Sequence, residues 1–207
     1  MKIARTILTV LLLASIAFIV KQEPWAASEP PVMHASASAE HRLAQSMQGK
    51  LDHIQQNGEL SHPDQTPTIM TEEEVNDYIA SGRIVLPQGV KKLSMEGRTG
   101  VVTAFLNVNF DEIRAGQKSS NPMLSIFSGQ HDVRVEADAA GSGGQGNVHV
   151  REVSIDGFSV PHVALEYFVS KYISPKYPNI GIDSRFQLPN KIDLAKVGYH
   201  KLTVTQK

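Results

Sequence analysis

The chain of 207 residues contains no cysteine. Disulfide bridges, thiolate metal ligands and a lipid anchor on cysteine are therefore excluded, and the fold depends on its core alone. An excess of one charge is also absent, because 20 basic and 21 acidic residues leave a net charge of -1. Without a basic surplus, the composition gives no indication of a nucleic-acid partner.

Long hydrophobic runs are absent except at the N-terminus. Lys2 and Arg5 precede an apolar run from Ile7 to Val20, and Ala26 and Ala27 follow it. A positive flank, a short apolar core and small residues are typical of an export signal.

Two interpretations of this segment stay open. Residues 1–27 form a cleaved signal peptide, or residues 3–20 stay in the inner membrane as an anchor, with the basic flank inside. Both predict an exported protein, periplasmic or extracellular, which meets the membrane through this segment only if the segment is not cleaved. Without the first 27 residues, the chain has 17 basic and 20 acidic residues and a net charge of -3.

Motifs for catalysis or metal binding are missing as well. The segment Gly141–Gly146 matches GxGxxG, but a nucleotide site needs a helix after it, and here a strand pattern follows. None of the eight histidines has a histidine four residues away, and no serine sits in a Gly-x-Ser-x-Gly turn. We predict no catalytic residue, no metal and no cofactor, and therefore not an enzyme.

Composition divides the rest of the chain into three parts. Residues 28–38 are rich in Ala, Ser, Glu and Pro and predict a flexible spacer. Residues 39–70 predict a peripheral helix, Ala39–Gln56, and a loop. The helix has one apolar face, formed by Leu43, Met47, Leu51 and Ile54. This face either packs on the domain edge or docks on an envelope protein. Residues 71–207 predict a single extracytoplasmic α+β domain.

The domain opens with a helix start signal. Thr71 and Glu74 have the spacing of a capping box, and Gly82 predicts the end of the helix. The carboxylates of Glu72 and Glu73 also suit the positive end of the helix dipole, so they need no functional role.

Strand patterns follow from Val90. Residues alternate between apolar and polar over Val102–Phe110, and a hairpin joins this strand to Gly89–Glu96. A second hairpin spans 132–155, with a flexible glycine loop at its tip, a bulge near Arg151–Val153, and His149 facing Glu136.

A broad apolar helix is predicted from Pro161 to about Ile173, followed by strands at Arg185–Leu188, Ile192–Val197 and Tyr199–Thr205. Hairpins with few helices indicate an α+β fold, a curved antiparallel sheet of about five to seven strands covered by two or three helices.

Three short segments resemble uncharacterised bacterial exported domains of the YpmS-like type. Met70–Ile79 is similar to their "LTEEELNxYL" opening, Val153–Pro161 to "vsiGxlxlP", and Phe186–Pro189 with Ile192 to a closing "lP…I" strand. The resemblance spans about residues 70–204. The resemblance implies a module with a long curved sheet that holds helices, and some modules of this type bind lipids. It assigns no catalytic residues.

The apolar helix over an apolar sheet face suggests a groove for a ligand. We predict a non-catalytic extracytoplasmic module that binds a lipid or another apolar small molecule between helix and sheet. The candidate ligand-binding residues are Leu165, Phe168, Val169, Tyr172 and Phe105. Two alternatives stay open: these side chains only fill the core, or the protein is an envelope-associated interaction or scaffold protein.

Overall fold

The computed structural model describes residues 37–114, 126–175, 177–178 and 181–207. The predicted export segment and nearly all of the predicted spacer lie outside these residues. Among the helices of the described part, none is both long enough and apolar enough to cross a membrane.

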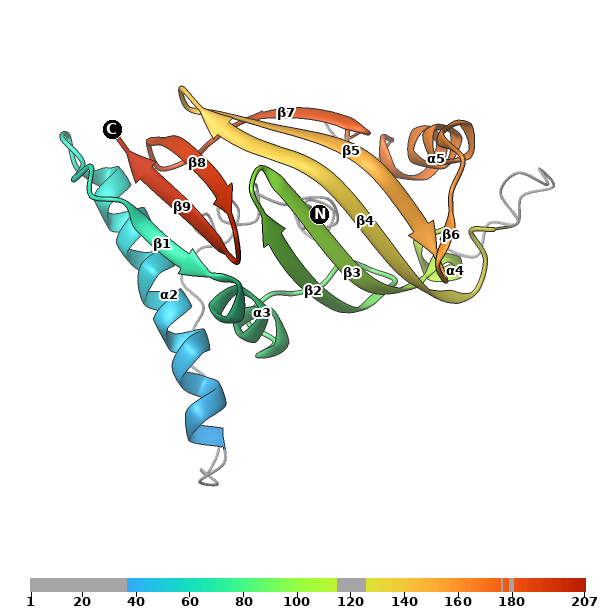
Figure 1. The fold of residues 1–207 in the computed structure, drawn as a ribbon, viewed down its shortest axis with the longest axis horizontal. Coiled ribbons are helices and arrows are strands. Elements are labelled where there is room, and N and C mark those ends of the chain that lie inside the picture. Colours follow the sequence, from blue (N-terminus) through green and yellow to red (C-terminus); the bar gives the residue numbers. More distant parts are fainter. Residues whose placement is uncertain (1–36, 115–125, 176, 179–180) are drawn as a thin grey trace.

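The described residues form one open antiparallel sheet of nine strands, with helices packed beside it (Figure 1). The predicted α+β class is confirmed. The strands are β1 (Thr68–Thr71), β2 (Val90–Arg98), β3 (Val101–Asn109), β4 (Gln130–Ser142), β5 (Gln145–Ile155), β6 (Phe158–Ser159), β7 (Asp183–Gln187), β8 (Ile192–Gly198) and β9 (Lys201–Gln206). The helices are α2 (Ala37–Glu59), α3 (Glu72–Ala80), α4 (Phe110–Ile113) and α5 (His162–Phe168), which continues as the π-helical turn η3 (Val169–Ile173).

The sheet contains two short strands that the sequence pattern does not reveal. β1 pairs with β9 in a segment predicted to be loop, and β6 pairs with the end of β5. Both strands are too short to show a clear alternation of apolar and polar residues, so the sequence does not mark them. Their pairing is decided by strands that lie beside them in the fold.

Two hairpins share one edge of strand β4. β3 pairs with Gln130–Asp138 of β4, and β8 pairs with Ala140 and Gly141 farther along the same strand. On its other edge β4 pairs with β5, which in turn pairs with β7. The tips of the β2–β3 and β8–β9 hairpins therefore meet.

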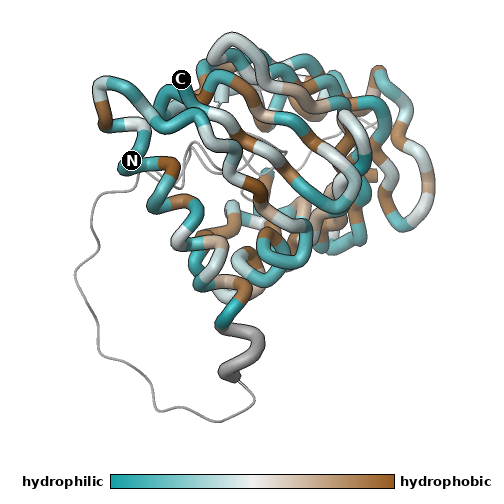
Figure 2. Tube along the Cα trace, turned by 60° about the vertical axis from the view of Figure 1, so that its left-hand side comes forward, coloured by the Kyte–Doolittle hydropathy of each residue, from teal (hydrophilic) through white to brown (hydrophobic). Residues whose placement is uncertain are grey.

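The predicted two-residue rhythm is confirmed along the central strands. In β3, Val102, Ala104 and Val108 are buried, and the same buried alternation continues in β4 and β5. Figure 2 shows hydrophobic and hydrophilic residues alternating along the strands. The predicted bulge is also confirmed: Glu136 pairs with Glu152 but Ala137 pairs with Val150, which leaves Arg151 as the extra residue.

The glycine segment differs from the predicted flexible loop. β4 and β5 continue through it, and only Gly143 and Gly144 form the turn, with φ of 59° and 75°. These positive φ values favour glycine at both positions. Gly146 lies within β5, where a Cβ atom would come 2.4 Å from the ring of Phe186.

The observed turn also changes the predicted partner of His149. Because the turn is centred on Gly143 and Gly144, His149 lies opposite Asp138 and not opposite Glu136. Its Nδ1 atom is 2.6 Å from Oδ1 of Asp183 on β7. The two pairings differ by two residues in register, so His149 stays on the same face and only its partner changes.

Helix α2 buries most of its predicted apolar face within the chain. Met47, Leu51 and Ile54 are nearly inaccessible, whereas Leu43 is 39% exposed and Ala44 takes its place. The helix packs against α3, β1 and β9. A face covered in this way is not free to dock on an envelope partner.

The capping box of α3 is confirmed. The Glu74 N–H donates to Thr71 Oγ1 at 3.2 Å, and the Thr71 N–H donates to Glu74 Oε2 at 2.8 Å. Burial alone would raise the pKa of Glu74, but hydrogen bonds from Lys50, Ser46 and Thr71 lower it below its ordinary value. The same carboxylate therefore ties α2 to α3.

Candidate functional site

Four of the five predicted ligand residues lie together in α5 and η3. Leu165, Phe168 and Tyr172 are buried, and Val169 is half-buried against the same core. The Phe168 ring stacks on Phe127 at 4.2 Å between centroids.

Two further rings complete this aromatic cluster. The ring of Phe110 meets that of Phe168 edge-on, with 5.7 Å between the centroids, and the centroid of the Tyr172 ring lies 5.2 Å from that of Phe168. Rings in these arrangements stabilise a core beyond the effect of their buried area. The geometry is that of packed core side chains.

Phe105 lies apart from the other four. Its neighbours in β3, Ala104 and Leu106, pack into the core, so Phe105 projects from the opposite face of the sheet. Phe105 is 36% exposed. The prediction that Phe105 shares one site with the α5 residues is wrong, because successive residues of a strand point to opposite faces.

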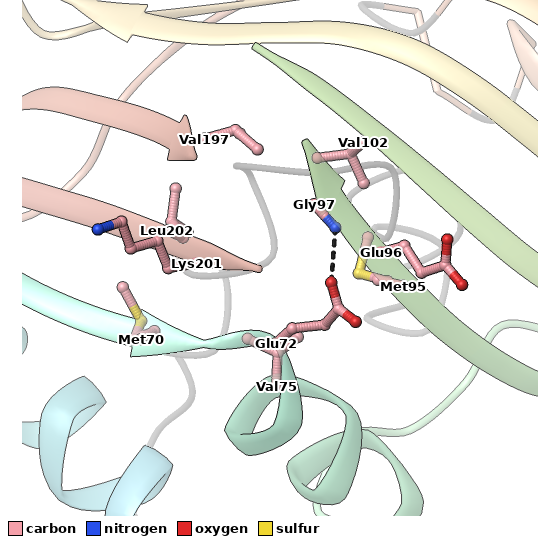
Figure 3. A pocket seen from close by; sticks show the side chains of 10 residues that line it. All are labelled: Met70, Glu72, Val75, Met95, Glu96, Gly97, Val102, Val197, Lys201 and Leu202. Atoms are coloured by element: carbon pink, nitrogen blue, oxygen red, sulfur yellow. Dashed lines mark hydrogen bonds between the residues drawn. The ribbon is translucent and has the colours of Figure 1, made fainter. Parts of the chain in front are cut away.

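A pocket of about 70 Å³ opens where α3 meets the two hairpin tips (Figure 3). Its lining is mostly apolar and comes from segments far apart in sequence. The apolar side chains are Met70, Val75, Met95, Val102, Val197 and Leu202; Glu72, Glu96, Gly97 and Lys201 complete the lining. A surface opening with this lining suits an alkyl group.

Glu72 holds this junction together. Its Oε2 atom accepts hydrogen bonds from the Gly97 N–H at 2.8 Å and from His200 Nδ1 at 2.7 Å. The backbone is joined too, since the Glu72 N–H donates to the His200 carbonyl at 3.0 Å, and the His200 N–H donates to the Gly97 carbonyl at 2.9 Å. One carboxylate therefore links α3 to both hairpin tips.

Sequence reasoning assigned Glu72 only to the helix dipole and missed this role. Its partners, Gly97 and His200, are 25 and 128 residues away. No local motif marks such a contact. Only the capping box, which fixes where α3 begins, could have indicated that Glu72 projects from the first turn.

The pocket lining offers no catalytic constellation. It contains no hydroxyl, thiol or imidazole side chain. Within the described residues, no group of three or more His, Asp or Glu side chains could hold a metal ion. The mostly apolar lining is suited to binding an apolar group.

A separate polar clamp lies at the other end of β4. His131 Nδ1 is 2.6 Å from Asp156 Oδ2, and Nε2 is 2.7 Å from the carbonyl oxygen of Ser128. Both ring nitrogens face acceptors, which favours the imidazolium form. The Asp156 hydrogen bond and then the Ser128 bond raise the pKa of His131, and His131 in turn lowers the pKa of Asp156.

Comparison of the chain with protein-family models, curated proteins and solved structures finds no significant match. The resemblance to the YpmS-like family therefore stays a prediction.

Proposed function

We propose that the protein is a non-catalytic extracytoplasmic module that binds an apolar ligand, such as the end of a lipid alkyl chain. The observation that carries the proposal is the pocket between α3 and the hairpin tips, whose lining is mostly apolar. The N-terminal sequence supports the extracytoplasmic placement.

The size of the pocket limits what it can hold. A volume of about 70 Å³ is well below the ~300–1,000 Å³ of sites that enclose a whole small molecule. The ligand therefore inserts only a terminal group of a few carbons. Each buried methylene contributes roughly 0.8 kcal/mol, so the binding is weak for each chain end.

The location differs from the predicted groove under α5. There, Phe168, Phe127 and Phe110 pack directly against one another. The pocket lies instead against Met95 and Val102 of the β2–β3 hairpin. The class of ligand is unchanged; only its place in the fold moves.

Photolabelling tests the proposal. The full chain is irradiated with a fatty acid that carries a diazirine at its methyl end, and labelled peptides are mapped by mass spectrometry. We expect labels on Met70, Met95 and Leu202. Val75→Phe fills the pocket with a larger side chain and should reduce this labelling at least fivefold.

Val85→Phe is the matched control, because Val85 is 68% exposed and does not line the pocket. It should label as the unmodified chain does. Equal labelling of all three proteins, or labels confined to other segments, would refute the pocket as the binding site.

An envelope interaction protein is the second candidate. The observation in its favour is an exposed apolar stretch in β6 and α5, where Phe158 is 79%, Val163 is 64% and Tyr167 is 41% exposed. Crosslinking in intact cells from a photoreactive residue at position 163 tests it. Crosslinks to one envelope protein are expected; a lack of any specific adduct would reject it.

A further inference from the structure

The outer face of the sheet carries a hollow of about 390 Å³ that the proposed function does not use. Phe105 of β3 lies in it, with Ser94 of β2 and Arg134 of β4 directly opposite on the neighbouring strands. Asn107 lies two residues along the same face. The hollow therefore combines one exposed ring with polar side chains from three strands.

A fixed row of polar groups borders the ring. Asn107 Nδ2 donates to Asp132 Oδ1 at 2.8 Å, and Gln130 Nε2 donates to Asn107 Oδ1 at 2.6 Å. These bonds hold the amide and carboxylate groups in place, and they leave one Asn107 N–H and the second Asp132 oxygen without a hydrogen bond to another described residue. Lys92 lines the hollow as well, and its ammonium group pairs with no other described residue.

We propose that this hollow binds a pyranose ring of a saccharide. The apolar C–H face of the sugar lies on the Phe105 ring, and its hydroxyl groups bond to Asp132, Asn107 and Lys92. The site lies on the opposite face of the sheet from the apolar pocket, so the proposal is independent of the proposed function.

Other ligand classes match the hollow less well. A purely apolar ligand would remove Asn107 and Asp132 from water without replacing their hydrogen bonds, which is costly. A simple anion would meet the Asp132 carboxylate, and Arg134 is already paired with Glu136 at 2.6 Å. A neutral polyol supplies donors, acceptors and one apolar face, and it matches all three kinds of group present.

The volume agrees with this class of ligand. About 390 Å³ falls within the ~300–1,000 Å³ of small-molecule sites and accommodates one or two sugar rings. The hollow is open to solvent and offers only one aromatic side chain, Phe105. We therefore expect a dissociation constant in the millimolar range for each bound sugar unit.

Titration followed by NMR tests the proposal. The full chain, labelled with ¹⁵N, is titrated with maltotriose, cellotriose and chitotriose. At least one trisaccharide should shift the backbone amides of β2, β3 and β4 around Phe105. Phe105→Leu should weaken that binding at least tenfold, while Phe158→Leu, an exposed phenylalanine outside the hollow, should bind as the unmodified chain does.

Asp132→Ala is a second variant that leaves the aromatic ring in place. It should also weaken binding, because it removes the carboxylate acceptor. No shifts with any of the three sugars, shifts confined to other segments, or equal affinity for the Phe105→Leu and unmodified proteins would overturn the proposal.

Discussion

Replacing Phe168 separates a core role from a ligand role for the α5 helix. Phe168 is 5% exposed and meets three other aromatic rings. Phe168→Ala removes a buried ring and leaves a cavity, which costs about 3–5 kcal/mol of unfolding free energy. Against a total stability of about 5–15 kcal/mol, that loss is large enough to measure without ambiguity.

A milder variant guards against complete unfolding. Phe168→Leu keeps most of the apolar volume but loses the ring pairs with Phe127, Phe110 and Tyr172, each worth about 0.5–1.5 kcal/mol. Because the three pairs share one ring, their contributions do not add in full, and we expect a total cost of roughly 1–3 kcal/mol, less than for Phe168→Ala. Phe158→Ala, at 79% exposure, is the matched control and should change stability by less than about 0.5 kcal/mol.

Urea unfolding monitored by far-UV circular dichroism measures these differences, provided that the slope against urea is the same for each variant. A cost below about 1 kcal/mol for Phe168→Ala would refute the assignment of this ring to the core. If that variant also lost a lipid that co-purifies with the unmodified chain, the predicted groove between α5 and the sheet would be favoured instead.

Three further variants test the local structure. Thr71→Ala removes the helix cap and should cost about 0.5–2 kcal/mol in urea unfolding, whereas Thr71→Ser should restore most of it. Gly146→Ala places a Cβ atom against the Phe186 ring and should lower the melting temperature measured by calorimetry; no change would mean that the ring moves aside freely. His131→Asn should abolish the part of the pH dependence of folding stability that comes from the His131–Asp156 pair. The pKa of His131 is raised above its ordinary 6.5, so its contribution to folding stability is full below pH 6.5 and is lost as the pH rises through the folded-state pKa. The pKa of Asp156 is lowered, so its contribution to stability is lost only in acid. Unfolding measured between about pH 5 and 8 should therefore show the unmodified chain losing stability relative to the variant as the pH rises, and parallel curves would contradict this.

Local rules in the sequence determined much of the fold. The capping box at Thr71, the alternation over Val102–Phe110 and the bulge near Arg151 depend on side chains within a few residues of one another, so a single chain shows them. Pro161 also marks the start of α5 locally, although it is the N-cap and not, as predicted, the first helical residue. Together these patterns were enough to predict an antiparallel sheet with helices and most of its strands.

Tertiary structure alone decided where the sites lie. The pocket forms because the tips of two hairpins, near Gly97 and His200, meet the first turn of α3, and no periodicity connects these segments. Likewise the sequence predicts Phe105 and Phe168 in one site, yet Phe168 lies in α5 within the core and Phe105 projects from the opposite face of the sheet. Sequence spacing determines which face a residue takes relative to its neighbours, whereas the pairing of distant strands determines what that face meets.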